Sequence, residues 1–100
     1  MKFKIIGAGS IGNHLAHAAR CLKWEVTVCD IDPEALRRMR EEIYPQRYGS
    51  WDESIGLHLA DDEPKGGFDL IAIGTPPDTH LPLATAAVSE MPRAVLVEKP

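Results

Sequence analysis

The order of the expected elements predicts an α/β fold with a doubly wound parallel sheet in the strand order 3-2-1-4-5. An apolar strand at the N-terminus runs directly into a glycine-rich turn at residues 7–12 and then into a helical pattern. Strand and helix patterns alternate after it, as right-handed crossovers between parallel strands require. The run at residues 68–73 is almost continuously apolar, which is typical of a central strand covered on both faces.

Length and composition indicate one globular domain that spans residues 1–100. Hydrophobic residues make up 44% of the chain and charged residues 26%, which excludes the disordered and membrane-embedded classes. The chain has no apolar run of about 18 residues and no signal-peptide pattern, so we expect a cytoplasmic protein without a membrane partner. A net charge of −4 without a cluster of Lys and Arg argues against nucleic acid as a partner.

No metal site is expected from the histidines or the cysteines. His14 and His17 lie on one predicted helix, but neither an acid nor a third ligand accompanies them. Cys21 and Cys29 form no CxxC motif and have no suitably spaced histidines. We expect both thiols to be reduced and mostly buried.

The glycine-rich turn has the spacing of a Rossmann-type dinucleotide-binding motif, in which each glycine has a physical role. Gly7 permits the tight turn from strand to helix, Gly9 lets the backbone approach a pyrophosphate, and Gly12 allows the helix to pack closely on the strand. The free amides of Ser10 and Ile11 at the helix N-terminus then face the phosphates. The alternative is a glycine-rich turn that serves packing only.

Residues 24–29 are rich in β-branched and aromatic residues and alternate in polarity, which predicts the second strand. This strand ends at Asp30, which follows Gly12 at close to the roughly 20-residue spacing of the acid that hydrogen-bonds an adenosine ribose. Its carboxylate would accept from the ribose hydroxyls and repel a 2′-phosphate, so NAD is the expected cofactor. Asp32 precedes Pro33 and is instead predicted to be the N-cap of the next helix.

One helix is predicted before the second strand in the sequence, and another after it. Apolar residues recur in both at helical spacing, which predicts one face packed on the sheet: Ile11, Leu15, Ala18 and Leu22 in the first, and Leu36, Met39 and Ile43 in the second. The charged residues of the second helix are expected to face solvent. Arg37 and Arg38 could nevertheless approach a 2′-phosphate, which leaves NADP open.

The segment 44–67 has the weakest pattern. We predict a short third strand near Arg47 and Tyr48, followed by a helical turn or two over residues 52–59. Trp51 is expected to pack rather than to contact a ligand, and residues 63–67 to form a turn.

A loop after the fourth strand leads to the last helix and the last strand. Pro82 is compatible only with the first helical turn, where amide hydrogens lack intrahelical partners. Thr79 is therefore the predicted N-cap, with Asp78 as the alternative. Residues 93–97 predict the fifth strand.

Ligands in such sheets bind at the carboxyl ends of the strands, where four groups of residues lie: residues 7–12, Asp30, residues 74–80 and residues 98–100. With Gly-Thr-Pro-Pro-Asp-Thr-His at residues 74–80 and Glu-Lys-Pro at residues 98–100, the whole chain resembles the glucose–fructose oxidoreductase / inositol dehydrogenase family of NAD(P)-dependent enzymes. The resemblance implies that Lys99 is catalytic and points at the reacting carbon. It also implies that Thr75 and Pro76 line the nicotinamide side of the cofactor, with His80 as the matching histidine, and that Gly74 and Glu98 belong to the cofactor site.

The resemblance further implies the cofactor-binding half of an oxidoreductase, which transfers a hydride between nicotinamide and a hydroxyl or carbonyl carbon of a sugar, polyol or nucleotide sugar. Family members continue into a substrate-binding C-terminal domain, which we expect to be missing here, so that the chain alone is inactive and an uncovered fifth strand promotes homo-oligomers. The alternatives are a ligand-sensing NAD-binding regulatory domain and a folded, non-catalytic fragment. Such a sensor has no reason to carry the Thr-Pro-Pro or Glu-Lys-Pro sequences.

Overall fold

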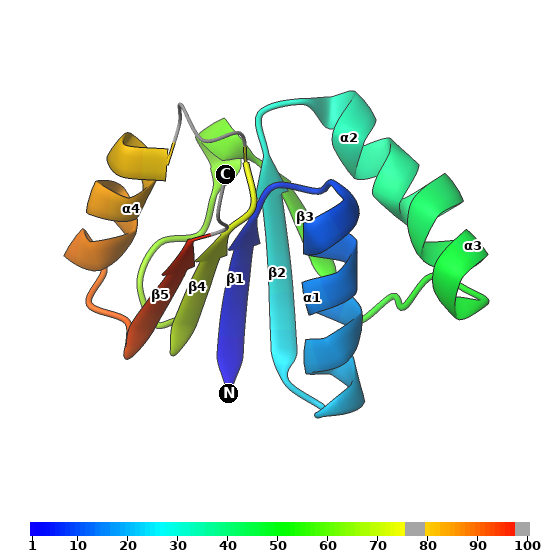
Figure 1. The fold of residues 1–100 in the computed structure, drawn as a ribbon, viewed down its shortest axis with the longest axis horizontal. Coiled ribbons are helices and arrows are strands. Elements are labelled where there is room, and N and C mark those ends of the chain that lie inside the picture. The colour runs from blue at the N-terminus through cyan, green and yellow to red at the C-terminus, as the bar shows by residue number, and fades with distance from the viewer. Residues whose placement is uncertain (76–79, 98–100) are drawn as a thin grey trace.

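The computed structural model describes residues 1–75 and 80–97, with residues 80 and 81 described by their backbone alone. In this part of the chain, five parallel strands form one sheet in the order β3-β2-β1-β4-β5, which confirms the predicted strand order (Figure 1). The strands are β1 (Lys2–Ile6), β2 (Glu25–Asp30), β3 (Gly56–Leu59), β4 (Leu70–Ile73) and β5 (Ala94–Val97).

Helices cover both faces of this sheet, as alternate residues of β4 demonstrate. Ala72 belongs to the core cluster that α1 (Ser10–Cys21) covers, whereas Ile71 and Ile73 pack with Ala87 of α4 (His80–Ser89). Figure 1 shows α4 on one side of the strands, and α1 with the helical segment 33–48 on the other. This two-sided burial explains why β4 is almost continuously apolar, and it confirms the doubly wound arrangement.

A continuous helical segment follows β2 and consists of three parts: α2 (Pro33–Arg38), the π-helix η1 (Met39–Ile43) and α3 (Tyr44–Tyr48). Asp32 is its N-cap, as predicted, because Asp32 Oδ1 accepts a 2.9 Å hydrogen bond from the Glu34 N–H. The π-helical part ends directly before the turn that contains Pro45. A wider turn accommodates a proline there, which has no N–H to donate within a helix.

The predicted third strand near Arg47 and Tyr48 is wrong, because both residues lie in α3. The Tyr48 ring stacks on His17 of α1 with ring centroids 3.8 Å apart, and Tyr44 meets the same histidine edge-on. Residues four apart are separated by about 6 Å along a helix but by about 13 Å along a strand, so a helix is what lets both tyrosine rings contact one histidine.

The predicted helical turns over residues 52–59 are wrong as well. Residues 56–59 form β3, which pairs with β2 from Thr27 to Asp30. A short, half-exposed edge strand has a weak local pattern, and its pairing partner lies far away in the sequence. Its conformation therefore depends on the sheet and not on its own residues. The 3₁₀ helix η2 (Ala60–Asp62) follows it.

Several smaller predictions are also settled. Trp51 packs against the core cluster and Pro82 lies in the first turn of α4, as predicted. Cys29 is buried, but Cys21 is exposed, which contradicts the prediction, because Cys21 is the last residue of α1. The predicted N-caps Thr79 and Asp78 lie outside the described residues. Within the described part of the chain, the helices are too short or too polar to cross a lipid bilayer.

Candidate functional site

A cleft with a volume of about 590 Å³ opens at the carboxyl edge of the sheet. Ile6 of β1 is in register with both Cys29 of β2 and Ile73 of β4, so the residues that follow these strands meet at one place. Five of the predicted site residues line the cleft: Gly7, Gly9, Asp30, Gly74 and Thr75.

The other predicted site residues form two groups. The first group begins α1, directly after the glycine turn: Ser10, Ile11 and Gly12. The second group lies outside the described residues: Pro76, Glu98, Lys99 and the side chain of His80. The last described residue, Val97, is in register with Ile73, so β5 ends at the same edge of the sheet as β4.

The three glycines of the turn have different surroundings. At Gly7, φ is +114°, and a Cβ atom would lie 3.0 Å from the backbone of Gly74. At Gly12, a Cβ atom would lie only 2.0 Å from the carbonyl oxygen of Gly7. At Gly9, it would meet no protein atom within 4 Å. The turn itself therefore requires Gly7 and Gly12, whereas Gly9 leaves open space in front of the backbone.

The start of α1 borders this open space. Gly9 is the N-cap and contributes no side chain that could accept from the first amides of the helix. The first N–H groups of a helix have no intrahelical partner, and the helix dipole adds about half a positive charge at this end. The geometry therefore favours an anion in front of Gly9.

The Asn13 side chain holds the backbone of the glycine turn, a role that the sequence analysis does not predict. It is fully buried, and Nδ2 donates to the carbonyl oxygens of Ala8 at 3.1 Å and Gly9 at 2.8 Å. A buried amide next to the last glycine of the motif was the available signal, since a buried polar side chain needs partners.

Asp30 connects the two loops that border the cleft. Its Oδ2 accepts a 2.9 Å hydrogen bond from the Ala8 N–H, and its Oδ1 accepts one of 2.9 Å from the Asp32 N–H. Each carboxylate oxygen has a second lone pair. Asp30 can therefore hold the loops and still accept from a hydroxyl group of a ligand.

The arginines of the segment 33–48 have different environments. Arg37 forms ion pairs with three carboxylates, those of Glu34, Glu41 and Glu42. The hydrogen bonds that Arg37 donates to these acids, to Glu34 foremost, raise the pKa of Arg37 above its ordinary value. Arg47 of α3, in contrast, lies beside the first residue of α1. Its Nη1 donates to the Ser10 carbonyl oxygen at 2.9 Å, and its Nη2 donates to Ser10 Oγ at 2.7 Å. The sequence predicts a strand at Arg47 and therefore gives no indication of this contact.

A buried ion cluster lies beside the cleft. Lys4 of β1 is fully buried, and its Nζ lies 2.6 Å from Glu63 Oε2 and 2.7 Å from Glu90 Oε2. Glu63 lines the cleft together with Cys29. Burial, and next the Glu63 carboxylate, raise the pKa of the Cys29 thiol to about 12, so this thiol stays protonated at neutral pH. The lysine within the apolar first strand was the sequence signal for this cluster.

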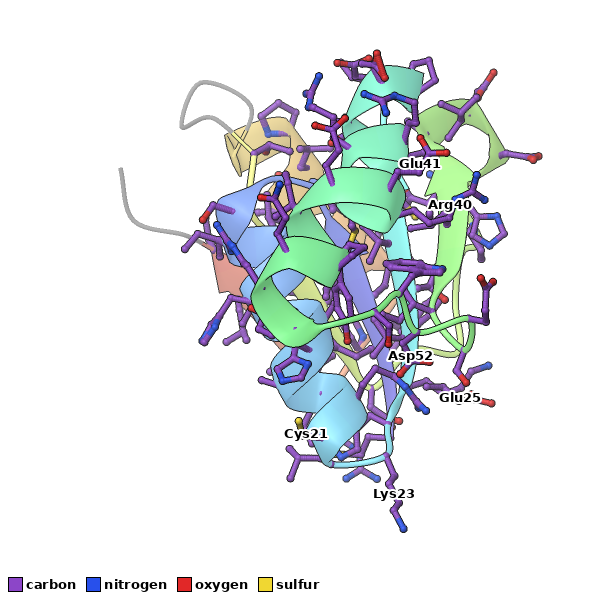
Figure 2. The ribbon with its side chains drawn as sticks, turned by 90° about the vertical axis from the view of Figure 1, so that its right-hand side faces the viewer. Cys21, Lys23, Glu25, Arg40, Glu41 and Asp52 are labelled. Atoms are coloured by element: carbon purple, nitrogen blue, oxygen red, sulfur yellow. The ribbon has the colours of Figure 1, made fainter. Side chains whose placement is uncertain are left out.

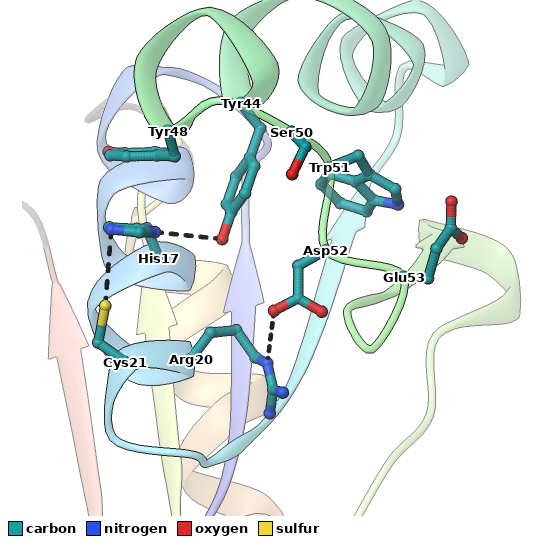
Figure 3. Close-up of a pocket in the computed structure, with 9 residues that line it drawn as sticks. All are labelled: His17, Arg20, Cys21, Tyr44, Tyr48, Ser50, Trp51, Asp52 and Glu53. Carbon is teal, nitrogen blue, oxygen red and sulfur yellow. Dashed lines mark hydrogen bonds and ion pairs between the residues drawn. The ribbon is translucent and has the colours of Figure 1, made fainter.

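A second cavity, of about 430 Å³, lies where α3 and the following loop cross α1 (Figure 3). His17 Nδ1 lies 3.3 Å from the Tyr44 hydroxyl, and His17 Nε2 lies 3.5 Å from Cys21 Sγ. Arg20 Nε donates to Asp52 Oδ2 at 2.9 Å. The His17–Tyr44 contact joins α1 to α3, and the Arg20–Asp52 contact joins α1 to the loop before β3, whereas the His17–Cys21 contact lies within α1. Among the described residues, no group of three His, Cys, Asp or Glu side chains could hold a metal ion.

Comparison with known proteins identifies a family for the whole chain. The GFO/IDH/MocA family model, described as an oxidoreductase family with an NAD-binding Rossmann fold, matches residues 1–100. No curated protein sequence matches the chain.

Solved structures show the same fold. One is a structure whose description concerns the substrate-directed dual catalysis of dicarbonyl compounds by diketoreductase. It has a TM-score of 0.67 and 19% identity over 97% of this chain. Another, from Arthrobacter sp. FB24, is described as an F420-dependent NADP reductase and has a TM-score of 0.62 and 29% identity over 90% of this chain. The chain spans 40% of the length of each of them.

Proposed function

Residues 1–100 belong to the GFO/IDH/MocA oxidoreductase family, which has an NAD-binding Rossmann fold, and on this premise we propose that the cleft at the carboxyl edge of the sheet binds a nicotinamide adenine dinucleotide. The observation that carries the proposal is the open space in front of Gly9, next to the start of α1. A pyrophosphate needs close approach to the backbone and unpaired N–H groups, and both are available at this point.

The adenosine end of the cofactor belongs beside Asp30. Ile31 follows it, is 85% exposed and lines the same cleft. A large apolar side chain exposed to water at a strand end offers a surface for the flat face of adenine. The Asp30 carboxylate would accept from the ribose hydroxyls, as the sequence predicts.

NAD is the cofactor that the charges around Asp30 favour. A 2′-phosphate would meet the carboxylates of Asp30 and Asp32 there. Of the two arginines that could compensate this repulsion, Arg37 and Arg38, the first already pairs with three glutamates. Because one structural neighbour is described as an NADP reductase, both cofactors belong in the binding experiment.

The reaction we propose is hydride transfer to or from a hydroxyl or carbonyl carbon of a sugar, polyol or nucleotide sugar. The bound nicotinamide supplies or accepts the hydride. Lys99 would hold or relay the proton of the substrate oxygen, and its ammonium would stabilise developing alkoxide charge. Gly74, Thr75, Pro76, His80 and Glu98 would line the nicotinamide side, and a further domain would bind the substrate.

Calorimetric titration of the chain with NADH and NADPH tests this function. We expect NADH to bind, and Gly9→Val to weaken its binding by more than about tenfold, because the new side chain occupies the phosphate position. The circular dichroism spectrum and the melting temperature should remain those of the wild type, since this side chain starts in open space. Undiminished NADH binding by Gly9→Val would contradict the proposed site.

Cofactor preference is a separate prediction. We expect NADH to bind more tightly than NADPH, and Asp30→Ala to reduce the difference by removing the acceptor for the ribose and the charge that repels a 2′-phosphate. The ratio of the two dissociation constants is the quantity to compare, because loss of the Ala8 contact would weaken both cofactors together. Equal wild-type affinities would refute the assignment of NAD.

A further inference from the structure

We infer that Arg47 of α3 is a phosphate-binding residue of this site, which contacts the pyrophosphate of the dinucleotide although it lies far outside the glycine motif; this inference rests on the proposed function. Arg47 holds Ser10, the first residue of α1, through two hydrogen bonds of 2.9 and 2.7 Å. Gly9, whose backbone faces open space, directly precedes Ser10. The guanidinium therefore stands at the border of the region where an anion is expected.

The guanidinium has donors left for a ligand. A guanidinium carries five N–H donors, and the bonds to the Ser10 carbonyl oxygen and hydroxyl use two of them. Both residues are exposed, so a ligand can reach the remaining donors. The two bonds fix the orientation of the planar group before any ligand arrives, which lowers the entropic cost of binding.

No carboxylate of the described residues compensates the charge of Arg47, in contrast to the charges of Arg20 and Arg37. Arg20 pairs with Asp52, and Arg37 pairs with three glutamates. In the part of the chain that the structure describes, no carboxylate lies within ion-pair distance of Arg47. Hydrogen bonds of an arginine to phosphate are charge-assisted and roughly twice as strong as neutral ones.

The fold holds α3 where Arg47 can act. Tyr48, the neighbour of Arg47, stacks on His17 of α1, and Tyr44 is buried against the same histidine. Figure 2 shows that the helical segment 33–48 crosses α1 with its α3 end over that helix. Arg40 lies on the side of the segment that is turned away from α1. Arg47 thus comes from an element packed on α1, and not from a flexible loop.

The experiment compares a ligand that has the pyrophosphate with one that lacks it. ADP-ribose is titrated calorimetrically into wild type and Arg47→Ala at low salt, and adenosine binding is followed by nuclear magnetic resonance. We expect Arg47→Ala to weaken ADP-ribose binding by about tenfold or more and to leave adenosine binding unchanged. Arg40→Ala is the matched control, because it removes the same charge from the same helical segment and should bind ADP-ribose as the wild type does.

A second variant distinguishes loss of the charge from damage to the fold. Gln at position 47 can still donate to Ser10 but has no charge, so Arg47→Gln should fold normally and show the same loss of ADP-ribose affinity. The salt dependence of ADP-ribose binding should become shallower in both variants, since one phosphate contact is gone. Wild-type ADP-ribose affinity in Arg47→Gln, or an equal loss of adenosine binding, would overturn the assignment of Arg47. Absence of ADP-ribose binding to the wild type would instead refute the proposed function.

Discussion

Gly12 illustrates how one atom decides whether the glycine turn can form. A Cβ atom there would lie 2.0 Å from the Gly7 carbonyl oxygen, so Gly12→Ala must displace the turn or α1. Overpacking of this kind costs about 1–3 kcal/mol, which lowers the melting temperature of a chain of this size by several degrees. Thermal unfolding followed by circular dichroism measures the effect. Gly9→Ala is the control, and equal melting temperatures for the two variants would contradict the described packing.

The two cysteines should differ strongly in reactivity. Cys21 is exposed, whereas Cys29 is buried with its pKa raised to about 12, and only the thiolate is a nucleophile. We expect one thiol of the native protein to react rapidly with an aromatic disulfide reagent at neutral pH, and the second to react only after unfolding. Cys21→Ser should abolish the rapid phase. Two rapid phases in the native wild type would show that Cys29 is accessible.

At the scale of elements, the contact between Arg20 and Asp52 joins α1 to the loop before β3. The hydrogen bond from Arg20, foremost, holds the pKa of Asp52 below its ordinary value. A depressed carboxyl pKa contributes stability above the unfolded-state pKa of about 3.9, and this contribution disappears as the pH falls through the folded-state pKa.

Asp52→Asn should therefore lower the free energy of unfolding at pH 7 by at most about 1 kcal/mol, because the Asp52 side chain is 29% exposed and the pair is partly screened. The difference between variant and wild type should vanish in acid, below the folded-state pKa. Urea unfolding across this pH range measures both effects, with Glu53→Gln as the control for a neighbouring acid. A difference that persists in acid would assign the loss to packing.

The helical segment 33–48 shows where local patterns stop being informative. Its beginning follows from Asp32 and Pro33, whose capping roles depend only on neighbouring residues. Its end does not, because Tyr44 and Tyr48 both pack on one ring of α1, that of His17. The aromatic pair suits a strand equally well, and Gly49 after it can end either a strand or a helix, so the local pattern does not distinguish the two.

At the scale of the whole molecule, β5 is an edge strand of the described sheet. Leu96 and Val97 are 48% and 43% exposed, and an edge strand offers unpaired backbone groups to another chain. We expect the chain to self-associate at high concentration, and Leu96→Lys to shift it towards the monomer. Light scattering tests this, and a constant mass of 11.0 kDa at all concentrations would contradict it.

The sequence by itself determined the strand order, the glycine turn and the position of Asp30 at the carboxyl edge of the sheet. These features depend on short spacings and on one rule, that parallel strands bring their carboxyl ends to the same edge of a sheet. Five of the residues that line the cleft, Gly7, Gly9, Asp30, Gly74 and Thr75, were therefore predictable.

Only the tertiary structure decided which residues far apart in the sequence contact one another around that edge of the sheet. Arg47 meets Ser10, and Lys4 meets Glu63 and Glu90, across separations that no periodicity spans. The same holds for β3, whose residues become a strand because β2 offers them hydrogen bonds. Such contacts depend on how helices and strands pack in space, and a local pattern carries no information about the partner on the other side.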